Sequence, residues 1–151
     1  MLFRSPKFFL FDLGIRHAAA GLKPSRETVL TNPGPFFEQW VGIELWKRLQ
    51  YLGEGRLLYL RTRDGMEIDF VIETRKRQSG TKPSIVCVEV KSSERWDPSW
   101  NRPMLELAAS GGVRADGLYG VYRGDRRLHF YGIHVLPVRD FLSALHAGKV
   151  F

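Results

Sequence analysis

Two strand-like segments carry acids and a lysine where a buried strand normally has apolar side chains. The first, residues 66–74, contains Asp69, and the second, residues 84–91, ends with Glu89 and Lys91. Because side chains alternate between the two faces of a strand, Glu89 and Lys91 share a face. Charged groups in an apolar strand are costly unless they are paired or used in chemistry. The pattern therefore indicates either a salt bridge on an edge strand or a catalytic site.

The chemistry that suits these residue types is metal-assisted hydrolysis of a phosphodiester. Hard oxygen ligands hold Mg²⁺ or Mn²⁺, which activates water and neutralises the charge that develops on phosphorus. In that interpretation Asp69 and Glu89 bind the metal, and the carbonyl of Val90 adds a ligand. Lys91 then orients the attacking water or helps to deprotonate it.

Glu38 is a third acid in an unusual position. In a helix over residues 36–52 it lies about 50° from the centre of the apolar stripe. It would hold a second metal ion or a metal-bound water, although an acid in the first turn is also explained by the helix dipole alone. Glu44, on the other edge of the stripe, either supports the site or pairs with Arg48 four residues later.

Bulk properties limit the class of protein. A chain of 151 residues with 44% hydrophobic side chains suits one domain with a real core. No apolar run approaches the roughly 18 residues of a membrane span, and the first residues lack a signal-peptide layout, so we expect a cytoplasmic protein without membrane contact. The single cysteine, Cys87, excludes an intramolecular disulfide and is expected in the core.

The net charge of +7 favours a polyanionic partner. DNA is the partner we expect, although the charge would also serve solubility or an acidic protein. Guanidinium groups bind two phosphate oxygens at once, so basic residues near the acidic segments are candidate phosphate ligands. These are Arg61, Arg63, Arg75, Lys76 and Arg77. Alternatively, Asp69 is a strand-end acid that pairs with Arg61 or Arg63.

Aromatic and histidine residues add weaker indications. Trp96 and Trp100 lie in the polar loop after Lys91 and could stack on unpaired bases. Such residues more often cover a core or dock a partner. The histidines show no metal-ligand spacing, and His129 and His134 are expected on opposite faces of one strand.

The remaining pattern predicts an α/β protein with a sheet covered on both faces. Residues 1–31 are expected to form a lead-in segment packed on a domain of residues 32–151, and Asp64-Gly65 predicts a hairpin turn. The expected helices are residues 15–22, 36–52, 103–109 and 137–146, and the expected strands are residues 56–62, 66–74, 84–91, 118–122 and 128–136.

Five segments in order resemble a known family: KFFLFDLG (7–14), FEQWVGIEL (37–45), LRTRDGMEIDFV (60–71), VEVKSS (88–93) and IHVLP (133–137). The family is the C-terminal domain of unknown function of a group of prokaryotic AAA-type ATPases, which is similar to the PD-(D/E)XK nucleases. The resemblance spans nearly the whole chain. It implies a restriction-endonuclease-like three-layer sandwich with a central mixed sheet between helices.

Position by position, the resemblance matches Glu38, Asp69, Glu89 and Lys91 to the acidic and lysine positions of that superfamily. It implies a nuclease domain that uses Mg²⁺ or Mn²⁺ to cleave DNA, and a possible AAA-type ATPase module as partner. The sequence itself has no Gly-x-x-x-x-Gly-Lys-Ser/Thr loop. The rival interpretation is a non-catalytic domain of such an ATPase, which binds nucleic acid or protein and keeps the acids for structure.

Overall fold

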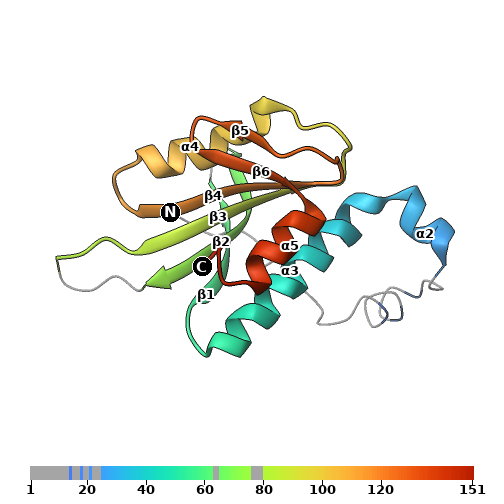
Figure 1. Cartoon of the computed structure of the whole chain (residues 1–151), viewed down its shortest axis with the longest axis horizontal. Helices are drawn as coiled ribbons and strands as arrows, with labels where there is room; N and C mark the ends of the chain where they lie inside the picture. The colour runs from blue at the N-terminus through green and yellow to red at the C-terminus, as the bar shows by residue number, and fades with distance from the viewer. Residues whose placement is uncertain (1–13, 15–17, 19–20, 22–24, 63–64, 76–79) are drawn as a thin grey trace.

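A six-stranded mixed sheet forms the centre of the part that the computed structural model describes, residues 14, 18, 21, 25–62, 65–75 and 80–151 (Figure 1). The strands are β1 (Arg56–Arg61), β2 (Glu67–Arg75), β3 (Ser84–Lys91), β4 (Arg114–Tyr122), β5 (Leu128–Phe130) and β6 (Ile133–Pro137). Their spatial order is β1-β2-β3-β4-β6-β5. The pairs β1–β2, β2–β3 and β5–β6 are antiparallel, whereas β3–β4 and β4–β6 are parallel.

Helices cover both faces of the sheet. The long helix α3 (Pro33–Leu52) and the last helix α5 (Val138–His146) pack on one face. The 3₁₀ turn η1 (Pro98–Asn101) leads into α4 (Arg102–Ala109), and the loop and helix residues around them pack on the other face. A short helix, α2 (Arg26–Thr31), projects beyond the sheet at the start of α3 (Figure 1). The three-layer α/β sandwich predicted from the sequence is therefore confirmed.

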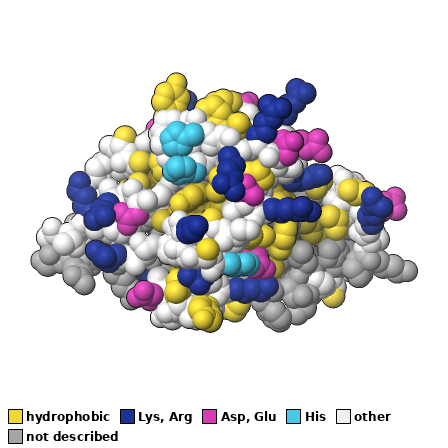
Figure 2. All heavy atoms as spheres, in the orientation of Figure 1, with side chains coloured by type: hydrophobic (Ala, Val, Ile, Leu, Met, Phe, Trp, Pro, Cys, Tyr) yellow, Lys and Arg dark blue, Asp and Glu magenta, His cyan; other side chains and the backbone are white. Residues whose placement is uncertain are grey.

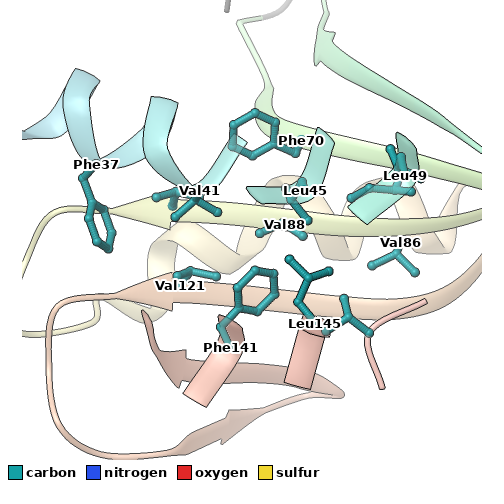
Figure 3. Packing of buried hydrophobic residues seen from close by; sticks show 13 residues of the cluster. Phe37, Val41, Leu45, Leu49, Phe70, Val86, Val88, Val121, Phe141 and Leu145 are labelled. Atoms are coloured by element: carbon teal, nitrogen blue, oxygen red, sulfur yellow. The ribbon is translucent and has the colours of Figure 1, made fainter. Parts of the chain in front are cut away.

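The apolar cluster between the sheet and α3 shows which side chains of β3 lie on the α3 face of the sheet (Figure 3). Val88 of β3 and Phe70 of β2 meet Val41 and Leu45 of α3, and each of these side chains is at most 1% exposed. Full burial of such a side chain stabilises the fold by roughly 1.5–3 kcal/mol. Because side chains alternate, Glu89 must face the opposite side of the sheet from α3.

A second cluster fills that opposite side. Cys87 of β3 packs with Trp96, with Met104 of α4 and with Leu118 of β4. All four side chains are at most 8% exposed. Glu89 lies two residues beyond Cys87 on the same face, so the acid borders this core at the end of the strand.

Some elements differ from the expectation. The helix expected from residue 36 begins at Pro33, because proline is favoured in the first turn and its missing N–H is not needed there. The single strand expected over residues 128–136 is two strands, β5 and β6. Tyr131 and Gly132 have φ values of 49° and 88°, so the chain reverses there in a tight two-residue turn with positive φ at both residues. The helix α2 was not predicted.

The hairpin expected at Asp64-Gly65 joins β1 and β2, which pair antiparallel; Asp64 itself lies outside the described residues. The helix expected over residues 15–22 also falls almost wholly outside them. The described part of the expected lead-in segment, residues 1–31, is chiefly α2, which contacts α3. None of the helices in the described ranges is long and apolar enough to cross a bilayer.

Candidate active site

Asp69 and Glu89 lie opposite each other on neighbouring strands. The antiparallel register pairs Phe70 with Val88, and one further step along it sets Asp69 against Glu89. Directly opposite residues project from the same face. The backbone N–H of Asp69 lies 3.4 Å from Oε2 of Glu89, and both residues are 6% exposed. The structure thus brings these two acids together.

The side chain of Asp69 is held in place by the next strand. The N–H of Val90 donates a hydrogen bond of 2.9 Å to Oδ2 of Asp69. At this end of the sheet each strand therefore offers a backbone N–H to a carboxylate of the other strand. These two hydrogen bonds between neighbouring strands help to fix the positions of both acids.

Lys91 covers the two carboxylates. Its Nζ contacts Oε1 of Glu89 and lies 4.0 Å from Oδ2 of Asp69. The side chain of Lys91 is 30% exposed, compared with 9% for Asp69 and 8% for Glu89. The ammonium group therefore forms the accessible side of the cluster. The sequence left open a salt bridge on an edge strand. The ion pair between Glu89 and Lys91 is present, but β3 lies between β2 and β4, so the edge position is wrong.

The electrostatics of the cluster are strongly perturbed. The pKa of Glu89 is raised to about 7, first by burial and then by the charge of Asp69, and Lys91 only partly offsets these two effects. Burial lowers the pKa of Lys91, but the charges of Glu89, Asp69 and Glu38 outweigh this effect, and the pKa is raised overall. Lys91 is therefore an ammonium at neutral pH, suited to positioning and charge neutralisation rather than to deprotonating water.

Glu38 approaches the cluster from α3. The first turn of this helix passes the end of β3, where a Cβ atom on Gly34 would lie 3.6 Å from Oγ of Ser92. Glu38 is half-buried one turn later. Its charge acts on Lys91 more weakly than the charges of Glu89 and Asp69 do. Glu38 thus belongs to the same electrostatic cluster at longer range, and its role as a metal ligand stays a prediction.

The donor set fits a hard divalent cation. Nowhere in residues 25–62, 65–75 and 80–151 do three His, Cys, Asp or Glu side chains converge closely enough to hold a metal ion. The structure brings together the carboxylates of Asp69 and Glu89, and the carbonyl of Val90 stays a predicted ligand. Mg²⁺ is often held by one or two carboxylates while its other positions carry water and substrate phosphate. Protein zinc sites are built mainly from Cys and His, whereas the side chains brought together here are carboxylates.

Trp96 and Trp100 form an aromatic wall beside Glu89, and the sequence pattern did not predict how these two side chains pack. Gly120 of β4 pairs with Glu89 in the parallel ladder. A Cβ atom on Gly120 would lie 2.6 Å from the ring of Trp96, so only glycine lets this indole lie against the sheet. Trp96 packs edge-on against Trp100, with ring centroids 5.2 Å apart, and its Nε1–H donates to Oδ1 of Asn101 at 3.0 Å.

The two expected phosphate ligands that the structure describes, Arg61 and Arg75, lie at opposite ends of the β1–β2 pair. Arg61 is exposed and pairs with Glu67, two residues before Asp69, so it lies at the acidic end of the sheet. Arg75 is exposed at the far end of β2, about 20 Å from Asp69 along the strand. The other candidates lie outside the described residues: Arg63, Lys76 and Arg77. On the face shown in Figure 2, basic side chains are spread among acidic and hydrophobic ones.

Other titratable residues are placed differently from the expectation. His129 and His134 are direct partners in the β5–β6 hairpin, with ring centroids 4.7 Å apart, so their placement on opposite faces is wrong. The turn at Tyr131 is the reason. Glu44 forms an ion pair of 2.9 Å with Lys47 and lies 3.4 Å from Nε2 of His146. These contacts give Glu44 a structural role between α3 and α5.

Comparison with known families identifies a domain family that matches most of the chain. The family described as "Domain of unknown function (DUF4143)" matches residues 33–141. No curated protein and no solved structure matches the chain. The matched span contains Glu38, Asp69, Glu89 and Lys91, and it extends from the start of α3 into α5. Because the match covers well over half of the sequence, this chain belongs to the DUF4143 family.

Proposed function

We propose that this protein is a nuclease that uses Mg²⁺ or Mn²⁺ to hydrolyse DNA phosphodiester bonds at the cluster of Asp69, Glu89 and Lys91. One observation carries the proposal: two buried carboxylates and an ammonium converge at one end of two adjacent central strands. The resemblance to PD-(D/E)XK nucleases implies a site built from the same acids and the same lysine. It also implies a sheet between helices, as in the observed three-layer arrangement.

The electrostatics of the cluster support a role for a cation. Burial, and then the charge of Asp69, raise the pKa of Glu89 to about 7, and Lys91 offsets this only in part, so the fold disfavours the charged form of this acid. A divalent ion between Asp69 and Glu89 would stabilise both acids in their charged form.

Each side chain then has a defined role. A bound divalent ion would supply Lewis-acid activation of water and of the phosphate. Asp69, oriented by the N–H of Val90, and Glu89 would hold the ion. In hydrolysis a water oxygen forms a bond to phosphorus, the P–O ester bond breaks and the departing sugar oxygen takes up a proton. Lys91, on the open side, would position the water and stabilise the negative charge that grows on the phosphate oxygens.

A cleavage assay tests the proposal. Purified protein is expected to cut fluorescently labelled DNA in Mg²⁺ or Mn²⁺ and to stop when a chelator is added. Asp69→Asn keeps the shape of the side chain but removes a ligand charge, and Lys91→Ala removes the ammonium. Each change is expected to lower the cleavage rate by about 100-fold or more.

Glu94→Gln is the matched control for the cleavage assay, because the Glu94 side chain is 80% exposed and lies outside the cluster. This variant should cut as the wild type does. Cleavage that persists unchanged in Asp69→Asn would contradict the proposal.

A second candidate is a non-catalytic interaction domain, with the AAA-type ATPase module implied by the resemblance as its partner. It is favoured by exposed aromatic side chains on α3, since such surfaces often mark interaction sites. Trp40 is 38%, Trp46 46% and Tyr51 83% exposed. In that case Asp69→Asn would leave partner binding intact, substitution of Trp46 would weaken it, and the acids would bind no divalent metal.

A further inference from the structure

We infer that Trp100 is a base-stacking residue of this site, and that the substrate is therefore a single DNA strand and not an intact duplex. The inference rests on the proposed function, because it assigns a substrate class to the same cluster. It goes further by naming the part of the substrate that the protein recognises beside the phosphate.

Trp100 borders the acidic cluster directly. The Nζ of Lys91 lies over the indole, 5.8 Å from its ring centroid, and the same ammonium contacts Glu89 and approaches Asp69. Trp100 is half-buried, so the residue keeps part of its surface accessible while it packs against the second apolar cluster. A phosphate bound at Lys91 would therefore have its neighbouring sugar and base within reach of the indole.

The two tryptophans of the wall have different roles. Trp96 is 8% exposed and is fixed by its contact with Gly120 and by the hydrogen bond from its indole N–H to Asn101. It also packs edge-on against Tyr122, with ring centroids 6.2 Å apart. Trp96 is thus a support that no ligand can reach. Trp100 packs at an interplanar angle of 88° on this support, which holds its ring in one orientation.

A rigid aromatic ring beside a phosphate site favours unpaired nucleotides. In a duplex both faces of a base are covered by its neighbours, whereas a base in a single strand can stack on a side chain. The carboxylates are also recessed, since Asp69 and Glu89 are only 6% exposed. A flexible single strand can lower one phosphate toward recessed groups more easily than a stiff duplex can.

Binding of defined DNA in the presence of a chelator, which prevents cleavage, tests the inference. The probes are an oligothymidylate of about 12 nucleotides and a duplex of the same length, followed by fluorescence anisotropy. The wild type should bind the single strand more tightly than the duplex. Trp100→Leu should weaken single-strand binding about tenfold, and Trp100→Phe, which keeps a ring, should recover part of the loss.

Controls separate stacking from folding. Trp46→Leu removes an indole that is 46% exposed on α3, across the sheet from the wall, and should leave binding unchanged. Thermal unfolding of Trp100→Phe shows whether the wall is intact. Equal affinity of wild type and Trp100→Leu for the oligothymidylate would overturn the inference. So would duplex binding as tight as single-strand binding, or no detectable binding of the single strand.

The two proposals can fail separately. If cleavage depends on Asp69 while oligonucleotide affinity is indifferent to Trp100, the nuclease stands and the stacking role is wrong. If Trp100→Leu weakens single-strand binding while cleavage is absent and metal does not bind, the protein is a single-strand binder and the catalytic proposal is wrong.

Discussion

The backbone N–H of Asp69 faces the carboxylate of Glu89 at 3.4 Å, across the end of the β2–β3 pair. In return, the strand that carries Glu89 donates the N–H of Val90 to the carboxylate of Asp69. Side chains thus take the place of main-chain acceptors where these two strands end. Substitution of either acid will therefore change both the sheet and the chemistry, and the two effects need separate readouts.

Replacement of Glu89 tests the cost of the buried charge. The pKa of Glu89 is about 7 in the fold against an ordinary 4.5, so between these values the folded protein holds a proton that the unfolded chain releases. Stability without metal should therefore fall as pH rises through this window. Glu89→Gln should be more stable than wild type by about 1–3 kcal/mol near pH 8, with a smaller gain near pH 5.

Urea unfolding in a chelator, at both pH values, measures this difference. Glu94→Gln serves as the surface control, because its side chain is 80% exposed, and should show no comparable change. If Glu89→Gln lowered the free energy of unfolding by the same amount at both pH values, the fold would not disfavour the charged form of Glu89.

Cys87 should be chemically inert in the native protein. It is 0% exposed, and burial raises the pKa of its thiol to about 12, so almost no thiolate is present at neutral pH. A thiol reagent such as dithiobis-nitrobenzoate should react only after unfolding. Cys87→Ser should lower the free energy of unfolding by about 1–3 kcal/mol, because a hydroxyl would be buried in an apolar cluster. Rapid modification of the folded protein would contradict the packing described here.

Gly120 should be intolerant of any side chain. A Cβ atom would lie 2.6 Å from the ring of Trp96 and 3.0 Å from Cγ2 of Val135, and neither group has room to move in the core. Gly120→Ala should therefore cost about 1–3 kcal/mol of stability and disturb the wall beside Glu89. Gly112→Ala is the control, because its added Cβ would be 3.8 Å from the nearest heavy atom, Oγ of Ser110. Equal stability of the two variants in denaturant unfolding would exclude the close packing of Trp96.

DNA binding should weaken as salt rises, because each neutralised phosphate releases counterions. Arg61 is exposed at the acidic end of the sheet, so Arg61→Glu should lower affinity and reduce the slope of log affinity against log salt by about one. Arg114→Glu changes the charge equally at the start of β4, at the end of the sheet opposite Lys91, and is the matched control. DNA affinity that does not change with salt, or an equal loss of affinity in both variants, would contradict phosphate binding at Arg61.

Much of the site follows from local sequence. Alternation in the apolar segment of residues 84–91 is enough to place Glu89 and Val88 on opposite faces of the sheet. The strand β3 also has the bounds that the sequence predicts. The Asp64-Gly65 turn then fixes the direction of β2. The pairing of Asp69 with Glu89 needs only the antiparallel register of neighbouring strands, which short connections favour.

The remainder depends on tertiary packing or weak turn signals. Residues 128–136 read as one strand because Tyr131 is an unusual residue for positive φ, so the hairpin that pairs His129 with His134 was missed. The aromatic wall depends on Gly120, which lies far along the chain from Trp96. Its role would have been visible only once the parallel pairing of β3 and β4 was known.

Mn²⁺ binding by calorimetry tests the central claim most directly, because it does not depend on a partner module or on finding the right DNA. Titration of millimolar Mn²⁺ into wild type should give a saturable heat, and Asp69→Asn should abolish it. Lys91→Ala should bind at least as tightly as wild type, since the competing ammonium is gone. No heat in the wild type, or the same heat in Asp69→Asn, would show that Asp69 and Glu89 are not a metal site and would contradict the proposed nuclease.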